Sequence, residues 1–206
     1  MAGAPLTDPR VRPDVAAVQR ALASGAAAVA GVTLGGDAEP TPCTLWTLRD
    51  LVRHLEIIAG AYVLWVGAAV GGRVGTLRAR EAQDAWNAEL LARLPARDTA
   101  DHRARFTALA GDHQRLVAAA ADLPMFELAG GARWTVGDHA GVAALEWHVH
   151  AWDLAVAGGQ AHRPAPDDVA ILAGIWEHLQ GPVVGVPLPA LDDAWAAVLT
   201  AAGRRP

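Results

Sequence analysis

The sequence predicts an all-α fold, a four-helix bundle with additional short helices. Capping residues are the first observation, because Thr47 with Asp50 and Thr135 with Asp138 each precede a long stretch with apolar residues at helical spacing. Composition is the second, because the chain is 52% hydrophobic and rich in alanine, which favours closely packed helices. No convincing strand ladder is found, and Met125 to Leu128 is the one short extended piece we expect.

Apolar spacing and capping residues divide the chain into helices in a definite order. The bundle is expected at about residues 14–160, followed by a helical extension at about 166–206, and together they make a single domain of 206 residues. Asp167 is expected to cap the first helix of the extension. The expected helices lie at about residues 14–32, 47–70, 81–94, 98–122, 135–157, 169–184 and 191–202.

The polar face of the helix at about 98–122 is expected to be solvated. The side chains on that face are Arg103, Arg105, Asp112, His113 and Arg115. Charged residues gathered on one side of an amphipathic helix usually face solvent.

Charge and cysteine content exclude several classes of protein. The net charge is −5 and all 17 basic residues are arginine, so a nucleic-acid partner is not indicated. The single cysteine, Cys43, cannot form an internal disulfide, and residues 1–14 lack the apolar core of a signal peptide, so a cytoplasmic protein is expected. The longest apolar run, at 55–72, contains Glu56 and is interpreted as a buried helix, with a membrane span as the alternative.

The stretch from Trp134 to Ala157 carries the most informative side chains. Glu146 and His150 are four residues apart on a predicted helix, so they share one face, and Asp153 lies one turn further on. Apolar residues at helical spacing surround this polar stripe, which indicates that the helix is buried. Buried charges need partners, and either a metal ion or an arginine-rich network would provide them.

Other polar residues near this stripe have less specific interpretations. His148 is two residues from both Glu146 and His150 and points away from them, so a packed or exposed histidine is expected. His139, two turns before Glu146, is a weaker candidate for the mouth of a pocket. Asp153 either orients a ligand histidine or holds an arginine or a backbone donor. Cys43 is interpreted as a buried or incidental thiol.

Three segments of the chain resemble the DinB-like metal-binding family. They are WTLRDLVRHLE at 46–56, ALEWHVHAWDLAVAGG at 144–159 and the tail LTAAGRRP at 199–206. The resemblance is closest to the group that contains mycothiol-dependent maleylpyruvate isomerase, in the subgroup that ends in Gly-Arg-x-Pro. It implies a DinB-like four-helix bundle in which His54, Glu146 and His150 bind a divalent ion, and it places an arginine at the position of Arg204.

The resemblance also implies a chemistry and a choice of cofactors. Zinc is the expected ion, with nickel or iron as alternatives, and mycothiol is a candidate co-substrate for a transferase or isomerase acting on a small molecule. A metal-dependent hydrolase or lyase that activates water, and a non-enzymatic helical ligand-binding protein, remain as alternatives. The isomerase carries a larger C-terminal domain, whereas only a short extension is expected here. A monomer or homodimer without a nucleic-acid or membrane partner is expected.

Overall fold

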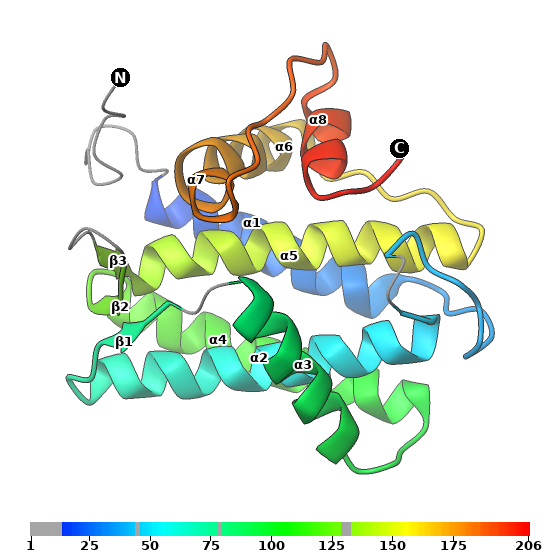
Figure 1. Ribbon diagram of the computed structural model, residues 1–206, viewed down its shortest axis with the longest axis horizontal. Helices are drawn as coiled ribbons and strands as arrows, with labels where there is room; N and C mark the ends of the chain where they lie inside the picture. The colour runs from blue at the N-terminus through cyan, green and yellow to red at the C-terminus, as the bar shows by residue number, and fades with distance from the viewer. Residues whose placement is uncertain (1–13, 44–45, 78–79, 129–132) are drawn as a thin grey trace.

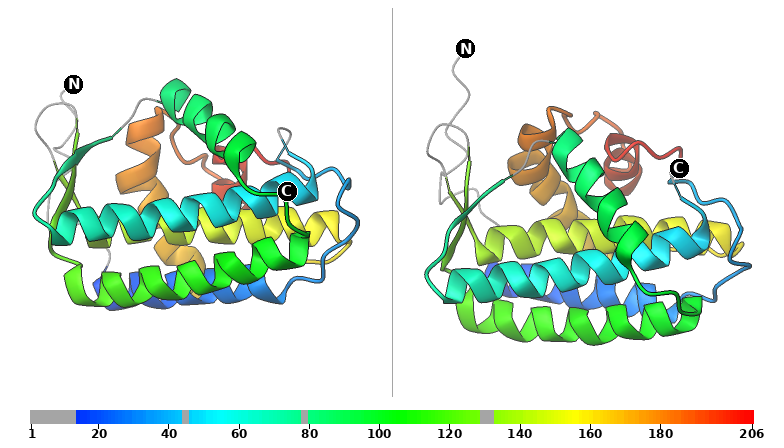
Figure 2. Two further views of the ribbon diagram at one scale, coloured as in Figure 1. Left: turned by 90° about the horizontal axis from the view of Figure 1, so that it is seen from below. Right: turned by 60° about the horizontal axis from the view of Figure 1, so that its bottom comes forward.

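The computed structural model describes residues 14–43, 46–77, 80–128 and 133–206, and it confirms the predicted all-α class. Four long helices form the bundle (Figure 1), namely α1 (Val15–Gly31), α2 (Leu48–Val70), α4 (Thr99–Ala120) and α5 (Val136–Ala157). A shorter helix, α3 (Arg80–Arg93), crosses the outside of α2, as Figure 2 shows. The assignment of the whole chain to one domain stays a prediction.

The predicted capping residues lie at the starts of α2 and α5, the helices that carry the predicted metal ligands. The Thr47 side chain accepts a hydrogen bond from the backbone N–H of Asp50 at the start of α2. At the start of α5, Thr135 and Asp138 form the reciprocal capping box that the sequence indicated. The end of α5 is fixed by Gly159, whose φ of 67° lies in the left-handed region that favours glycine.

The bundle pairs helices that are not neighbours in the sequence. Figure 1 shows α1 and α5 running in one direction and α2 and α4 running in the other. α1 packs mainly on α5, and α2 packs mainly on α4. The rings of Phe106 on α4 and Trp147 on α5 meet edge to face at 5.5 Å between centroids, and neither side chain is exposed. One core therefore joins both pairs.

A small sheet closes one end of the bundle, and the sequence did not predict it. β1 (Gly75–Thr76) pairs in parallel with β2 (Pro124–Glu127), which pairs in antiparallel fashion with β3 (Arg133–Thr135). Only β2 falls where an extended piece was expected. The strands have two to four residues each, which is too short for an alternating pattern to be recognised.

The C-terminal extension packs on the side of α1 and α5 (Figure 1). It contains α6 (Pro166–Ile175), a π-helical segment at Trp176–Gln180, α7 (Gly181–Val184) and α8 (Ala194–Ala201). The prediction that Asp167 caps α6 is wrong, because the N-cap is Ala165 and Pro166 opens the helix. Proline is well suited to the first helical position, since it needs no hydrogen-bond partner for its nitrogen.

Polar side chains tie α1, α5 and α6 together. The Ser24 hydroxyl lies 2.7 Å from Asp168 Oδ2 and 3.2 Å from His148 Nε2. The same His148 nitrogen is 3.0 Å from the carbonyl oxygen of Ala21, and it therefore carries the proton and donates it. His148 is thus a packed histidine that faces α1, as one of the two sequence interpretations held.

The expectation that the polar face of α4 is solvated is wrong in part. His113 is fully buried, and the Arg105 guanidinium donates to Glu56 Oε1 at 2.7 Å. His102 Nδ1 lies 2.6 Å from the other oxygen of Glu56. Glu56 is 4% exposed, so α2 places a carboxylate in the interior and α4 has to compensate it.

α2 is also long and apolar enough to cross a membrane by length and composition alone. In the fold, 56% of its most apolar window is buried against other parts of the chain, and it carries the buried polar residues His54 and Glu56. α2 is therefore a core helix of the bundle.

The buried histidines make stability depend on pH. Burial lowers the pKa of His113 to about 4, so the folded protein keeps this ring neutral at a pH where the unfolded chain, with a pKa near 6.5, is protonated. The contribution of His113 to the free energy of unfolding is therefore fully present above about pH 6.5, and it is lost as the pH drops towards 4. The contribution of one such histidine is about 1.4 kcal/mol per pH unit.

We expect His113→Phe to reduce this slope by about that amount, because an aromatic ring is kept while the titrating group is removed. Denaturant unfolding of the metal-free protein between pH 4.5 and 6.5 measures it. His178→Gln is the control, since that side chain is 39% exposed. An unchanged slope in His113→Phe would contradict the prediction.

Candidate metal centre

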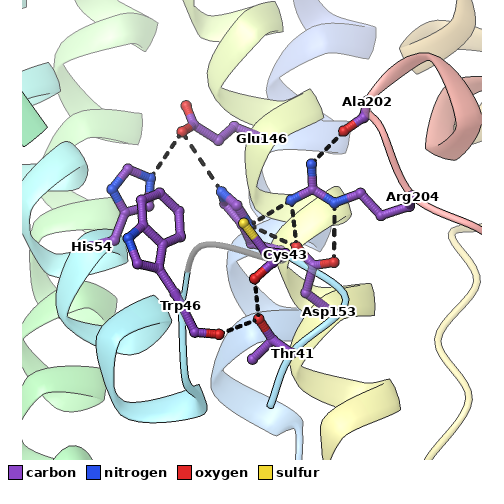
Figure 3. Close-up of polar contacts among 9 residues, drawn as sticks. Thr41, Cys43, Trp46, His54, Glu146, Asp153, Ala202 and Arg204 are labelled. Carbon is purple, nitrogen blue, oxygen red and sulfur yellow. Dashed lines mark hydrogen bonds and ion pairs between the residues drawn. The ribbon is translucent and has the colours of Figure 1, made fainter. Parts of the chain in front are cut away.

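The three predicted ligands come together between α2 and α5 (Figure 3). α2 and α5 run in opposite directions, so the start of α2, with His54, lies beside the later half of α5, with Glu146 and His150. Their donor atoms all lie within 4.8 Å of one another. Within the part of the chain that the structure describes, this is the one cluster of three such residues.

The distances suit a single small ion. Glu146 Oε1 lies 3.3 Å from His54 Nε2 and 3.8 Å from His150 Nε2. Two ligand atoms that are each bound to zinc in a tetrahedral site are about 3.4 Å apart. Both histidines are buried, whereas the Glu146 side chain is 25% exposed, so the cluster lies near the surface at its carboxylate.

The orientation of His150 is set by its other ring nitrogen. His150 Nδ1 lies 2.9 Å from Asp153 Oδ2, and a carboxylate only accepts, so Nδ1 carries a proton and Nε2 faces the cluster. Asp153 in turn accepts from the Arg204 guanidinium, from Nε at 3.1 Å and from an Nη at 2.6 Å. Asp153 therefore has two of the roles that the sequence left open: it orients a histidine and it holds an arginine.

Asp153 is completely buried, and this explains why it needs both partners. Burial alone would raise the pKa of Asp153, but hydrogen bonds from His150 and Arg204 lower it below its usual value. Asp153 therefore stays ionised at neutral pH. The third nitrogen of Arg204 donates to the carbonyl oxygen of Ala202 at 2.6 Å, so the tail at 202–204 is fixed against the site.

His54 is oriented by stacking instead of by a second carboxylate. The Trp46 ring stacks on the His54 ring with 4.3 Å between centroids, and it also lies 6.1 Å from the His150 ring. His54 Nδ1 is buried without a hydrogen-bond partner among the described residues. Burial is the largest influence on the pKa of His54 and lowers it, which favours the neutral imidazole that binds metals.

Glu146 is held by a residue that was not among the predicted site residues. The Tyr62 hydroxyl on α2 donates a short hydrogen bond to Glu146 Oε2. Burial raises the pKa of Tyr62 well above its usual value, with the Glu146 charge acting in the same direction, so the phenol keeps its proton. Burial would raise the pKa of Glu146 too, but its bonds to His54 and Tyr62 and the nearby His150 lower it, and the carboxylate is ionised.

The remaining candidates lie outside the cluster. His139 does not reach the surface: it is 3% exposed, and its ring meets the Tyr62 ring edge to face at 4.5 Å. Figure 3 places Cys43, a free cysteine, beside Arg204.

The donor set fits a divalent metal ion. Two imidazole nitrogens and one carboxylate oxygen are the donors of three-ligand zinc sites, which leave positions free for water or substrate. Closed structural sites use four protein ligands instead. The carboxylate that orients His150 is the kind of support that surrounds metal-binding histidines.

Comparison with known families identifies the region that contains the cluster. The family model of the mycothiol maleylpyruvate isomerase N-terminal domain matches residues 18–155, which include all three residues of the cluster. Comparison with curated proteins gave no match, and comparison with solved structures gave none.

We expect Arg204→Met to lower the free energy of unfolding by on the order of 3 kcal/mol, because the buried Asp153 carboxylate loses its charged partner. Arg205→Met is the matched control, since Arg205 is the next residue and is exposed. Denaturant unfolding at neutral pH checks both variants. Equal stability of the two variants would show that the Asp153–Arg204 pair contributes nothing to folding.

Proposed function

The chain belongs to the family of the mycothiol maleylpyruvate isomerase N-terminal domain, and from this premise we propose that it binds a divalent metal ion and acts with a low-molecular-weight thiol, mycothiol or a relative, on a small molecule. The reaction proposed is a transfer or an isomerisation. The observation that carries the proposal is the convergence of His54, Glu146 and His150 within 4.8 Å.

Each residue of the site has a distinct part in this proposal. His54, Glu146 and His150 would hold the ion, which supplies Lewis acidity and lowers the pKa of a water or thiol that it binds. Asp153 keeps the proton of His150 on Nδ1, so that Nε2 is free to bind. Trp46 stacks on one face of the His54 ring and restricts its rotation.

Zinc is the proposed ion, with nickel and iron as alternatives. Imidazole suits all three ions, and selection among them depends on geometry and availability. Burial favours the neutral form of His54, and the lowered pKa of Glu146 keeps its carboxylate ionised, as metal binding requires.

The thiol is supported by the family to which the chain belongs. Arg204 already donates from all three of its nitrogens to protein acceptors, so its role is to support Asp153. In this proposal the thiol is a second molecule, mycothiol or a relative. The cytoplasm is the proposed compartment, and the protein is proposed to be a monomer or homodimer.

Activation of water is the second candidate function. The Glu146 side chain is 25% exposed, so solvent reaches the open side of the cluster. A hydrolase or lyase would use the same three ligands and needs no thiol.

We expect the purified protein to carry close to one divalent ion per chain. His54→Ala, Glu146→Ala and His150→Ala should each weaken metal binding at least about 10-fold, since each removes one of three donors. Metal analysis after dialysis and a competition titration with a chromophoric chelator measure this. His148→Ala is the control, because His148 faces α1, and it should retain the ion. Loss of the ion in His148→Ala with retention in His150→Ala would reverse the assignment.

We expect mycothiol to bind only the metal-loaded protein. In the cobalt-substituted protein, adding mycothiol should produce a sulfur-to-metal charge-transfer band in the near ultraviolet, and apo protein should show none. Cys43→Ser is measured in parallel to separate the added thiol from the thiol of the chain. An unchanged cobalt spectrum at saturating mycothiol would favour activation of water.

A further inference from the structure

The two oxygens of Glu146 have different partners. Oε1 faces both histidines of the cluster, at 3.3 Å from His54 Nε2 and 3.8 Å from His150 Nε2. Oε2 accepts the hydrogen bond from the Tyr62 hydroxyl. A phenol O–H that donates to a carboxylate makes a charge-assisted hydrogen bond, which is stronger than one between neutral groups.

We propose that Tyr62 is a positioning residue that keeps Glu146 a one-oxygen ligand, by holding Oε2 while Oε1 faces the ion. This inference rests on the proposed metal site and extends it. A carboxylate with one oxygen bound elsewhere cannot bind an ion through both.

The surroundings of Tyr62 prevent the phenol from moving away. Its side chain is 4% exposed. The His139 ring meets it edge to face at 4.5 Å, and the rings of His113 and Trp65 lie at 5.5 and 5.6 Å between centroids. Contacts from α4, α5 and its own helix therefore fix the direction of the hydroxyl group.

The position of Tyr62 on α2 couples it to another ligand. Tyr62 lies eight residues after His54, and residues at this spacing share one face of a helix. α2 therefore supplies one ligand directly and orients a second ligand on α5. Any shift of α2 along α5 would therefore disturb both the position of His54 and the orientation of Glu146.

The consequence for the site is the number of positions left open. With Glu146 bound through one oxygen the protein supplies three donor atoms, as open zinc sites do. With both oxygens bound it supplies four donor atoms and one fewer position remains for water or a thiol. Tyr62 would thus preserve the open position that the proposed chemistry uses.

Tyr62→Phe tests this inference by removing one hydroxyl group and keeping the ring. We expect the cobalt-substituted variant to show a weaker visible absorption than the wild type, because a second carboxylate oxygen raises the coordination number. We also expect cobalt to dissociate at about 10-fold lower chelator concentration, because the carboxylate loses its orienting partner. Ser24→Ala is the matched control, since it removes a hydroxyl whose partners His148 and Asp168 lie elsewhere.

The outcomes separate the two proposals. A wild-type protein that binds no cobalt refutes the metal site, and the role of Tyr62 with it. A wild-type protein that binds cobalt, together with a Tyr62→Phe variant of identical spectrum and affinity, refutes the role of Tyr62 alone. A Ser24→Ala variant that changes as much as Tyr62→Phe also refutes it, because any lost hydroxyl would then have the same effect.

A second measurement does not depend on how well Tyr62→Phe folds. Tyr62 is the one tyrosine of the chain, so incorporation of fluorotyrosine gives a single fluorine resonance. We expect this resonance to shift on adding zinc and to stop shifting at one equivalent. A resonance that does not move in a protein that binds zinc would overturn the inference.

Discussion

The compensation of negative charge inside a helical bundle is the constraint on which this structure depends. Glu56 and Asp153 are buried carboxylates that each have an arginine as partner: Glu56 pairs with Arg105, and Asp153 pairs with Arg204. Glu146 forms its ion pairs with His54 and His150 and, among the described residues, with no arginine. Burial lowers the pKa of His54, so this histidine is not a full counter-charge. A divalent cation would complete the compensation at Glu146 in the way that arginine completes it at the other two.

The helical repeat explains how one helix carries both a cluster and its support. Glu146, His150 and Asp153 follow one another at spacings of four and three, and they lie along one stripe of α5. His148 falls between them in sequence and points to α1, where Ser24 and the Ala21 carbonyl group receive it. The candidate metal cluster and the hydrogen bonds to α1 therefore lie on opposite sides of α5.

The parts of the site that sequence reasoning found are those with a local pattern. Glu146 and His150 follow from the spacing of four, and His54 follows from the resemblance. The Tyr62 contact to Glu146 was missed because the residue lies in the apolar run at 55–72, which was interpreted only as a buried helix. Its distance of eight residues from His54 was a usable signal. The stacking of Trp46 on His54 and the pairing of Asp153 with Arg204 join segments whose proximity only the fold reveals. His113 was placed in solvent for a similar reason, since α4 alone does not show which of its sides faces α2 and α5.

The pairing of the helices has a consequence for how the chain folds. α1 packs on α5, and more than a hundred residues separate them in the sequence. The chain therefore has to close a long loop before the contacts between these two helices can form. Folding rates fall as the sequence separation of contacts rises, and simple helical hairpins form faster than this arrangement can. The cluster between α2 and α5 is itself a product of such distant pairing. Its three side chains can meet only after most of the bundle has assembled, so metal capture would be a late event in folding and would favour the finished fold over its precursors.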